Sequence, residues 1–309
     1  MKWRGRRQSQ NIEDRRGRSG RLRRPSLGKI RFPIGVPGRR GRLGRGRGRI
    51  GGLGLVVIVV IAVLLGFDPR QLLMGVDAPI ESSPLPLPEA ERSGADPLRD
   101  FVAVVLADTE DVWKSLLPSQ LNEPYREPKL VLFTGGVRSA CGYAGSAVGP
   151  FYCPGDQKVY LDLDFFRTLS GRLDAPGDFA QAYVIAHEVG HHVQTLLGIS
   201  QQVHQARRSV SESDANALSV MLELQADCFA GAWAHHADRT KDILEAGDID
   251  EALNAASAIG DDTLQKRSQG YVVPDSFTHG TSAQRQNWYR RGFETGQLQA
   301  CDTFSADNL

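Results

Sequence analysis

The sequence predicts an α+β fold that is mainly helical, contains a small β-sheet and is preceded by one transmembrane helix. Three observations support this prediction. An apolar run at residues 50–67 contains no charged residue and just reaches the length that spans a bilayer. Helical periodicity recurs after residue 97, and two segments, residues 129–137 and 158–165, have the character of strands. At 309 residues and 41% hydrophobic content, the chain can bury a large core.

The charges are distributed unevenly around the apolar run. Residues 1–49 hold 18 Lys and Arg and two acidic residues, whereas residues 50–309 hold 19 basic and 34 acidic residues. The positive-inside rule places the basic end in the cytoplasm and the following domain outside it. Because no small-residue cleavage site follows closely, the run is expected to remain as an anchor in the lipid bilayer. We therefore expect a single-pass inner (cytoplasmic) membrane protein with a periplasmic or extracytoplasmic domain.

The chain divides into four parts on composition. Residues 1–49 have too few apolar residues to fold alone and are expected to be disordered in the cytoplasm. Topology and anionic lipid explain their charge more simply than phosphate contacts do, so no nucleic acid is expected as a partner. Residues 50–67 form the transmembrane helix, and residues 68–96 form a Pro-rich stem. Residues 97–309 then form a single domain.

Residues 180–197 are predicted to form one helix that carries His187, Glu188 and His191 in the order H-E-x-x-H. Side chains four residues apart lie one turn apart on the same face, so both imidazoles can bind one zinc ion. Glu188 can then activate a metal-bound water. Three fixed positions are only moderately specific, and a chance arrangement on a helix is the alternative.

Glu223 and Asp227 lie in a second helical segment that begins near residue 213. A catalytic zinc ion needs a third protein ligand and one open position, and Glu223 can supply that ligand. Asp227, one turn later, is placed to accept a hydrogen bond from a metal-bound histidine. These residues predict one Zn²⁺ per chain. The alternative is a surface Glu–Asp pair with the same spacing.

His279 is the remaining candidate for a catalytic side chain. Thr281 and Gln284 form a capping-box pattern that places His279 just before a helix. Its imidazole can stabilise the oxyanion that forms when water attacks a peptide carbonyl. Arg285 can orient His279 or bind a substrate carboxylate. A loop histidine and a surface arginine are the alternative.

Three further patterns constrain the surroundings of the predicted zinc helix. Asp178 and Gln181 form a capping-box pattern at its start. The strand at residues 158–165 either offers an exposed edge that holds an extended peptide or is a plain half-buried strand. Gly231 and nearby alanines permit close packing against another helix, and residues 250–267 are predicted to form one further helix.

The four cysteines all follow the apolar run. An even number in an oxidising compartment indicates two disulfides. Cys141 and Cys153 flank a Gly-rich loop and are expected to pair, which leaves Cys228 to pair with Cys301. Four unpaired buried thiols are the alternative.

Taken together, these motifs resemble a known family, the bacterial putative neutral zinc metallopeptidases. The resemblance runs almost end to end and rests on the apolar span and on the segments MKWRGRRQSQNIEDRRG, VLADTEDVW, HEVGHHVQ, ELQADCFAGAW and HGTSAQRQNWYRRG. It implies a membrane-anchored, zincin-like peptidase of the gluzincin type. In that family pattern His187, His191 and Glu223 bind zinc, with His279 as the transition-state stabiliser.

The function expected from the sequence is therefore that of a zinc-dependent endopeptidase that acts on a peptide or protein substrate. Glu188 would be the general base. The competing interpretation is a catalytically silent, zinc-stabilised envelope scaffold or binding protein. Glu188 argues against that interpretation, because a structural zinc ion fills all four positions with protein ligands and needs no base.

Overall fold

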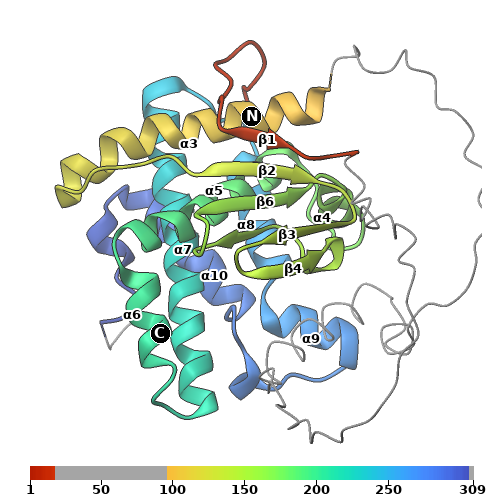
Figure 1. Ribbon diagram of the computed structural model, residues 1–309, viewed down its shortest axis with the longest axis vertical. Helices are drawn as coiled ribbons and strands as arrows, with labels where there is room; N and C mark the ends of the chain where they lie inside the picture. The colour runs from red at the N-terminus through yellow and green to blue at the C-terminus, as the bar shows by residue number, and fades with distance from the viewer. Residues whose placement is uncertain (18–95, 306–309) are drawn as a thin grey trace, which may run out of the picture.

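The computed structural model describes residues 1–17 and 96–305 (Figure 1). The strands are β1 (Ile12–Asp14), β2 (Lys129–Phe133), β3 (Gly136–Ser139), β4 (Gly142–Gly145), β5 (Phe151–Cys153) and β6 (Lys158–Asp162). The helices are α3 (Pro97–Leu121), α4 (Asp164–Gly171), α5 (Asp178–Leu196), α6 (Ile199–Ala206), α7 (Glu212–Lys241), α8 (Asp248–Ala258), α9 (Asp261–Gln269) and α10 (Ser282–Thr295). The described residues thus confirm a mainly helical α+β fold with a small sheet.

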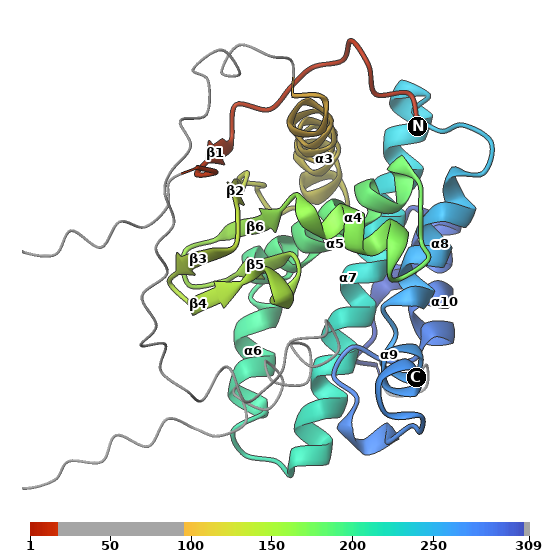
Figure 2. The ribbon, with the colours of Figure 1, turned by 90° about the vertical axis from the view of Figure 1, so that its right-hand side faces the viewer.

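The sheet separates a large helical core from a small core beneath a hairpin. Among the described strands its order is β1-β2-β6-β5, with β5 antiparallel to β6 and the other neighbours parallel. Leu130 and Leu132 face the helices, whereas Val131 and Phe133 belong to the second core, which the β3–β4 hairpin covers. This alternation follows from the two-residue period of a strand. Figure 2 shows the sheet on one side and α7, α8 and α10 on the other.

Helix α5 lies at the centre of the fold and is buried along most of its length. It contacts α3, α7 and α8 and also reaches β5 and β6. This position explains why the helix is apolar on several sides rather than along a single stripe. Gly198 follows its end with a φ of 75°, a left-handed conformation that glycine adopts without strain.

Helices α7 and α10 approach so closely that only glycine fits at their crossing. A Cβ atom on Gly231 would lie 2.1 Å from the carbonyl oxygen of Tyr289, and one on Gly292 would lie 1.9 Å from that of Cys228. The predicted close packing at Gly231 is confirmed, and α10 is the partner helix. The disulfides Cys141–Cys153 and Cys228–Cys301 are both present, as the sequence predicted.

Two predicted elements differ in extent from those observed. The helix expected over residues 250–267 is two helices, α8 and α9, because the chain turns at Gly260. A Cβ atom on Gly260 would lie 2.4 Å from the backbone nitrogen of Ser282, so this turn packs against the start of α10. The strand expected over residues 158–165 ends at Asp162, since α4 begins two residues later.

The capping box predicted for Asp178 and Gln181 is wrong. The residue that precedes the helix is Gly177, and the backbone N–H of Phe179 in the first turn donates instead to the carboxylate of Glu251 at 3.0 Å. Asp178 instead accepts a hydrogen bond from the α-ammonium group of Met1, with a distance of 2.7 Å. The reason is a tertiary contact between residues 177 positions apart, which outweighs the local pattern.

The expectation that residues 1–49 are disordered is wrong for residues 1–17. Strand β1 pairs with β2, and the indole ring of Trp3 packs edge-on against Phe101. This segment needs no core of its own because it uses that of the domain.

None of the helices in the described ranges is long and apolar enough to cross a membrane. The predicted transmembrane helix at 50–67 and most of the predicted stem lie outside those ranges.

We predict that Gly231→Ala destabilises the domain, because the added methyl group forces the backbones of α7 and α10 apart. Overpacking of this kind costs about 1–3 kcal/mol. Thermal unfolding of the full chain checks the prediction. Gly171→Ala is the matched control, since a Cβ atom there meets no atom within 4 Å. Equal melting temperatures for the two variants would contradict the proposed close approach.

Candidate metal centre

Three side chains from α5 and α7 converge on one point. His187, His191 and Glu223 each offer a potential metal-ligand atom, and these atoms lie within 4.8 Å of one another. The Nε2 atom of His187 is 3.2 Å from Oε2 of Glu223, and that of His191 is 3.4 Å from Oε1. Both imidazoles thus direct the same ring nitrogen toward one carboxylate.

The backbone of α5 allows Glu223 to come this close. Gly190 lies between the two histidines in sequence, and a Cβ atom there would be 3.0 Å from the carbonyl oxygen of Ala226. A larger residue at this position would push α7 away from α5. Glycine therefore has a packing role within H-E-V-G-H, separate from the metal chemistry.

Asp227 binds Nδ1 of His187, the ring nitrogen that does not face Glu223. Its Oδ1 atom accepts hydrogen bonds from Nδ1 of His187 at 2.8 Å and from the Tyr183 hydroxyl at 2.5 Å. Arg285 donates to both carboxylate oxygens, from Nε at 2.7 Å and from Nη2 at 3.0 Å. Asp227 has no solvent exposure. Because Nδ1 of His187 donates to Asp227, Nε2 is the ring nitrogen that can bind a metal once its own proton is lost.

The two roles predicted for Arg285 were to orient His279 and to bind a substrate carboxylate. The residue is only 1% exposed, and its guanidinium group is occupied by Asp227 and Tyr183. It is therefore not available to a substrate, and the carboxylate that it orients is that of Asp227. The alternative of a surface arginine is wrong for the same reason.

Gln194 orients the imidazole of His191, as Asp227 orients that of His187. Its Oε1 atom accepts a hydrogen bond from Nδ1 of His191 at 2.8 Å, and its Nε2 atom donates to the carbonyl oxygen of Leu222 at 2.7 Å. The amide group is therefore fixed by the backbone immediately before Glu223. Both histidines thus present Nε2 to the same site.

The donor set fits zinc. Two imidazole nitrogens and one carboxylate oxygen are ligands that catalytic zinc sites use, and three protein ligands leave a position for water or substrate. Burial lowers the pKa of His187, but the charge of Asp227 and the hydrogen bonds to Asp227 and Glu223 outweigh it and raise the pKa to about 10. Burial opposes ionisation of Glu223, yet both histidines hold its pKa well below the usual range. The pocket is therefore built for a cation.

Glu188 is buried beside these ligands. Burial raises the pKa of its carboxyl group, an effect that the neighbouring charges of His187 and His191 partly offset. The backbone of Tyr152 also acts on this carboxyl group and lowers its pKa. Tyr152 lies in β5, which is the end strand of the sheet in the described part of the chain. Glu188 therefore lies between the candidate ligands and a sheet edge.

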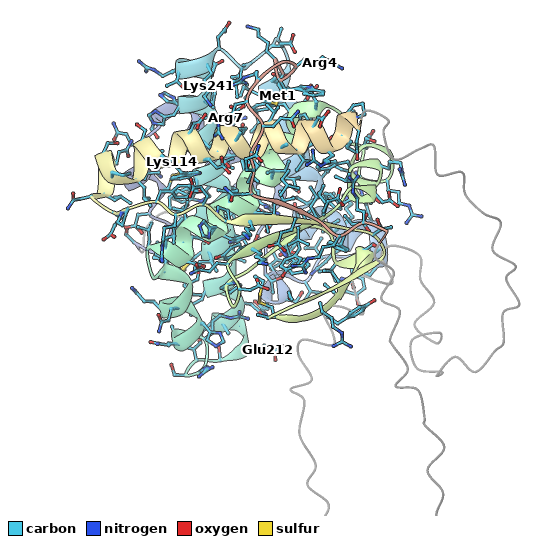
Figure 3. All side chains as sticks on the ribbon, turned by 45° about the horizontal axis from the view of Figure 1, so that its top comes forward. Met1, Arg4, Arg7, Lys114, Glu212 and Lys241 are labelled. Atoms are coloured by element: carbon cyan, nitrogen blue, oxygen red, sulfur yellow. A yellow bond between two sulfur atoms is a disulfide. The ribbon has the colours of Figure 1, made fainter. Side chains whose placement is uncertain are left out.

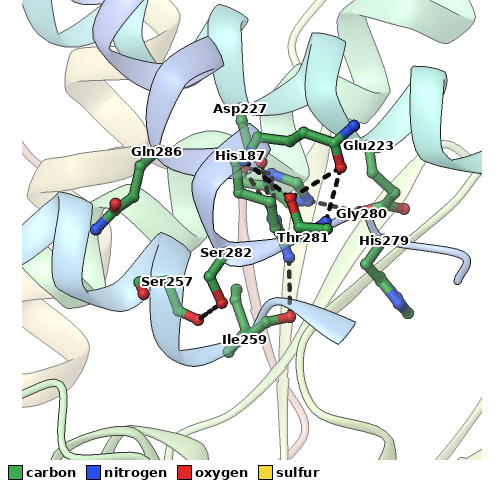
Figure 4. A network of polar contacts seen from close by, with 12 residues as sticks. His187, Glu223, Asp227, Ser257, Ile259, His279, Gly280, Thr281, Ser282 and Gln286 are labelled. Carbon is green, nitrogen blue, oxygen red and sulfur yellow. Dashed lines mark hydrogen bonds and ion pairs between the residues drawn. The ribbon is translucent and has the colours of Figure 1, made fainter. Parts of the chain in front are cut away.

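His279 lies in a loop that one carboxylate organises. Oδ2 of Asp261 accepts the backbone N–H groups of Thr278, His279 and Gly280 at 2.7, 2.6 and 3.1 Å. Oδ1 of Asp261 is 3.2 Å from Nδ1 of the His279 ring. The predicted capping box at the start of α10 is confirmed. Figure 4 shows this loop beside Glu223 and His187.

Three residues that the sequence analysis did not single out complete these contacts: Tyr183, Gln194 and Asp261. Local spacing could have indicated two of them, because Tyr183 precedes His187 by one helical turn and Gln194 follows His191 by three residues. Asp261 lies 18 residues before His279 and belongs to α9, whereas His279 lies in the loop before α10. No local pattern connects those two positions.

We predict that Asp227→Asn weakens zinc binding about 10- to 100-fold, the usual effect of removing the carboxylate that orients a metal-bound histidine. The variant also leaves Arg285 as a buried charge without its anionic partner, which lowers stability by ~3–5 kcal/mol. Competition with a chelator and thermal unfolding measure the two effects. Asp250→Asn, an exposed aspartate in α8, is the control. Parent-like affinity in Asp227→Asn would contradict the assigned role.

The chain is similar to other bacterial proteins over most of its length. The uncharacterized protein YpfJ of Escherichia coli (strain K12) is 47% identical over 304 residues, which cover 98% of this chain and 99% of that protein. The uncharacterized protein Rv2575 of Mycobacterium tuberculosis (strain H37Rv) is 41% identical over 265 residues, covering 80% of this chain and 86% of that protein. No solved structure matches the chain.

A family described as "Putative neutral zinc metallopeptidase" matches residues 1–304. That range includes both the helices of the candidate metal centre and the N-terminal segment. The chain belongs to this family of putative neutral zinc metallopeptidases.

Proposed function

We propose that this protein is a zinc-dependent endopeptidase with a zincin-like active site of the gluzincin type. The observation that carries the proposal is the convergence of His187, His191 and Glu223, with Glu188 buried beside them. Three ligands and an adjacent carboxylate provide both a metal site with an open position and a base. A purely structural zinc site has no use for that base.

When bound, the zinc ion would polarise the substrate carbonyl and lower the pKa of a coordinated water. The Glu188 carboxylate would accept the proton of the attacking water and later deliver it to the leaving amine. Because burial raises the pKa of this carboxyl group, it can exchange a proton closer to neutral pH than an exposed glutamate. Asp227 and Gln194 keep both imidazoles in the orientation that binding requires.

His279 would donate a hydrogen bond to the developing oxyanion. Asp261 supports this role, since it fixes the loop backbone and accepts a hydrogen bond from Nδ1 of the ring. Although desolvation lowers the pKa of His279, the hydrogen bond and charge of Asp261 and the charge of Glu223 raise it. A protonated imidazole is a strong donor to an oxyanion.

The open side of β5 offers a place for the substrate. Tyr152 is paired in register with Val159 of β6, yet its backbone interacts with Glu188. Helix α5, which carries the proposed base, contacts β5, so the open side of this strand lies close to that helix. An extended peptide bound along this edge by main-chain hydrogen bonds would pass the metal centre. The sequence left open whether residues 158–165 offer such an edge or form a plain half-buried strand. In the structure β6 lies inside the sheet, between β2 and β5.

The proposed location of the domain is outside the cytoplasm. All four cysteines of the chain form disulfides, which supports an oxidising compartment. The proposed substrate is therefore an extracytoplasmic peptide or protein.

We predict that Glu188→Gln abolishes peptide hydrolysis but retains zinc. Loss of a general base typically costs about 10²–10⁴-fold in rate, and Gln preserves the shape of the side chain. A mixed peptide library incubated with the zinc-loaded full chain and with the variant measures cleavage, and metal analysis measures zinc content. Glu223→Gln is the second variant and is expected to lose the metal.

Cleavage by the parent and none by Glu188→Gln would support the peptidase. Equal cleavage by both would contradict the mechanism. If neither cleaved any peptide while each held one zinc ion, the result would favour the scaffold function over hydrolysis.

We also predict that zinc binding releases a proton. In the metal-free site His187 is protonated below a pKa of about 10, and the metal must displace that proton. Affinity should therefore rise with pH, by about tenfold per unit while one proton is released. Titration calorimetry in buffers with different ionisation enthalpies measures the number of protons. An affinity that stays constant between about pH 6 and about pH 8 would contradict the assignment of His187 as a ligand.

A further inference from the structure

The N-terminal segment, residues 1–17, is bound along one edge of the domain by backbone hydrogen bonds as well as side chains. The backbone N–H of Leu130 donates to the carbonyl oxygen of Asn11 at 2.8 Å, and that of Ser9 donates to Ala103 at 2.9 Å. The N–H of Arg15 donates to Leu132 at 2.8 Å. These bonds join the segment to β2 and α3. In Figure 3 the segment passes α3, and its labelled residue Arg7 lies next to that helix.

Glu110 of α3 is a buried carboxylate that this segment surrounds. Its side chain is only 3% exposed. Arg7 donates to Oε2 at 3.0 Å, Asn11 donates to Oε1 at 2.8 Å, and the Ser9 hydroxyl also donates to Oε1 at 2.5 Å. These three partners all come from residues about 100 positions earlier in the chain. The domain thus buries a charge whose hydrogen bonds are supplied by the N-terminal segment.

A second carboxylate on the same helix receives another arginine. Arg6 donates to Oδ1 of Asp108 at 2.9 Å, and Lys241 of α7 donates to the same oxygen at 2.8 Å. Asp108 is 2% exposed. Arg7 reaches Asp111 as well, at 2.6 Å. The basic residues of the segment therefore compensate an acidic face of α3.

The α-ammonium group of Met1 occupies the acidic cluster where α5 and α8 begin. It lies 2.7 Å from Asp178, 3.0 Å from Glu245 and 3.3 Å from Asp248. Asp178 is the first residue of α5, the helix that carries the candidate metal ligands. The segment therefore also contacts the element that positions the active site.

We propose that residues 1–17 lie on the same side of the membrane as residues 96–305, as a structural part of the catalytic domain. The positive-inside argument treated the basic residues of this segment as free charges that face the cytoplasm and its lipid. Arg6 and Arg7 are instead bound by carboxylates of the domain. This proposal replaces the expectation that residues 50–67 cross the membrane once, with the N-terminus and the domain on opposite sides, because 18 apolar residues are too few to cross and return. It does not depend on hydrolytic activity.

Thiol labelling of the full chain in intact cells tests the proposal. Gln8→Cys in the segment and Glu212→Cys in the domain are both exposed positions, and all four native cysteines are in disulfides. Each variant is treated with a membrane-impermeant maleimide before and after permeabilisation. The proposal predicts the same labelling pattern for both positions. Labelling of one position before permeabilisation and of the other only afterwards would overturn it.

A stability measurement tests whether the bound segment is part of the fold. In the full chain, Glu110→Gln weakens the contacts with Arg7, Ser9 and Asn11 while preserving side-chain shape, and it should lower the melting temperature by several degrees. Glu123→Gln removes an exposed charge just beyond the same helix and is the control. Melting temperatures that are lowered by Glu110→Gln alone support the proposal. Equal melting temperatures for the parent and both variants would overturn it.

Discussion

The buried carboxylate of Asp227 is the group on which the candidate active site depends. It belongs to α7 and receives hydrogen bonds from Tyr183 and His187 of α5 and from Arg285 of α10. An anion with no solvent exposure is stable only if such partners surround it. The three helices must therefore hold their relative positions to within hydrogen-bond distance. That same requirement fixes the direction of His187 toward the metal site.

The packing of these helices follows from residues that have no role in chemistry. Gly190 allows the backbone of α7 to approach α5 closely. Gly231 and Gly292 allow α7 and α10 to approach each other closely. The disulfide between Cys228 and Cys301 then joins α7 to the chain after α10. Small residues and a covalent bond thus position the polar groups, and the polar groups orient the ligands. The centre is rigid because these constraints converge on α7.

Local spacing was sufficient to predict much of this site. The four-residue separation of His187 and His191 defines a shared helix face in any α-helix. Glu223, the third ligand expected from the sequence, faces them from α7. The disulfide pairs and the capping box before α10 were also predictable, since each depends on the sequence pattern or the count of cysteines. The mainly helical α+β class with a small sheet was predictable from the helix-like and strand-like hydrophobic periodicities of the sequence.

Contacts between distant residues account for what the sequence analysis missed. Asp178 has the pattern of a helix cap, yet its carboxylate binds Met1. Arg285 was expected to orient His279 or to bind a substrate carboxylate, because its actual partner, Asp227, is 58 positions away in sequence. Residues 1–17 looked too polar to fold because their apolar and acidic partners belong to the domain. In each case a local rule was valid, but a tertiary partner that no local pattern reveals changed the outcome.

X-ray absorption spectroscopy of the zinc-loaded full chain tests the central claim most directly, because it reports the ligands of the metal itself. The proposed site predicts two imidazole nitrogens, carboxylate oxygen and a solvent oxygen, with one zinc ion per chain. Glu223→Gln should lose this signature. Four protein ligands with no solvent position would indicate a structural zinc ion and would contradict the proposed peptidase. A spectrum without two histidine nitrogens would contradict the assignment of His187 and His191.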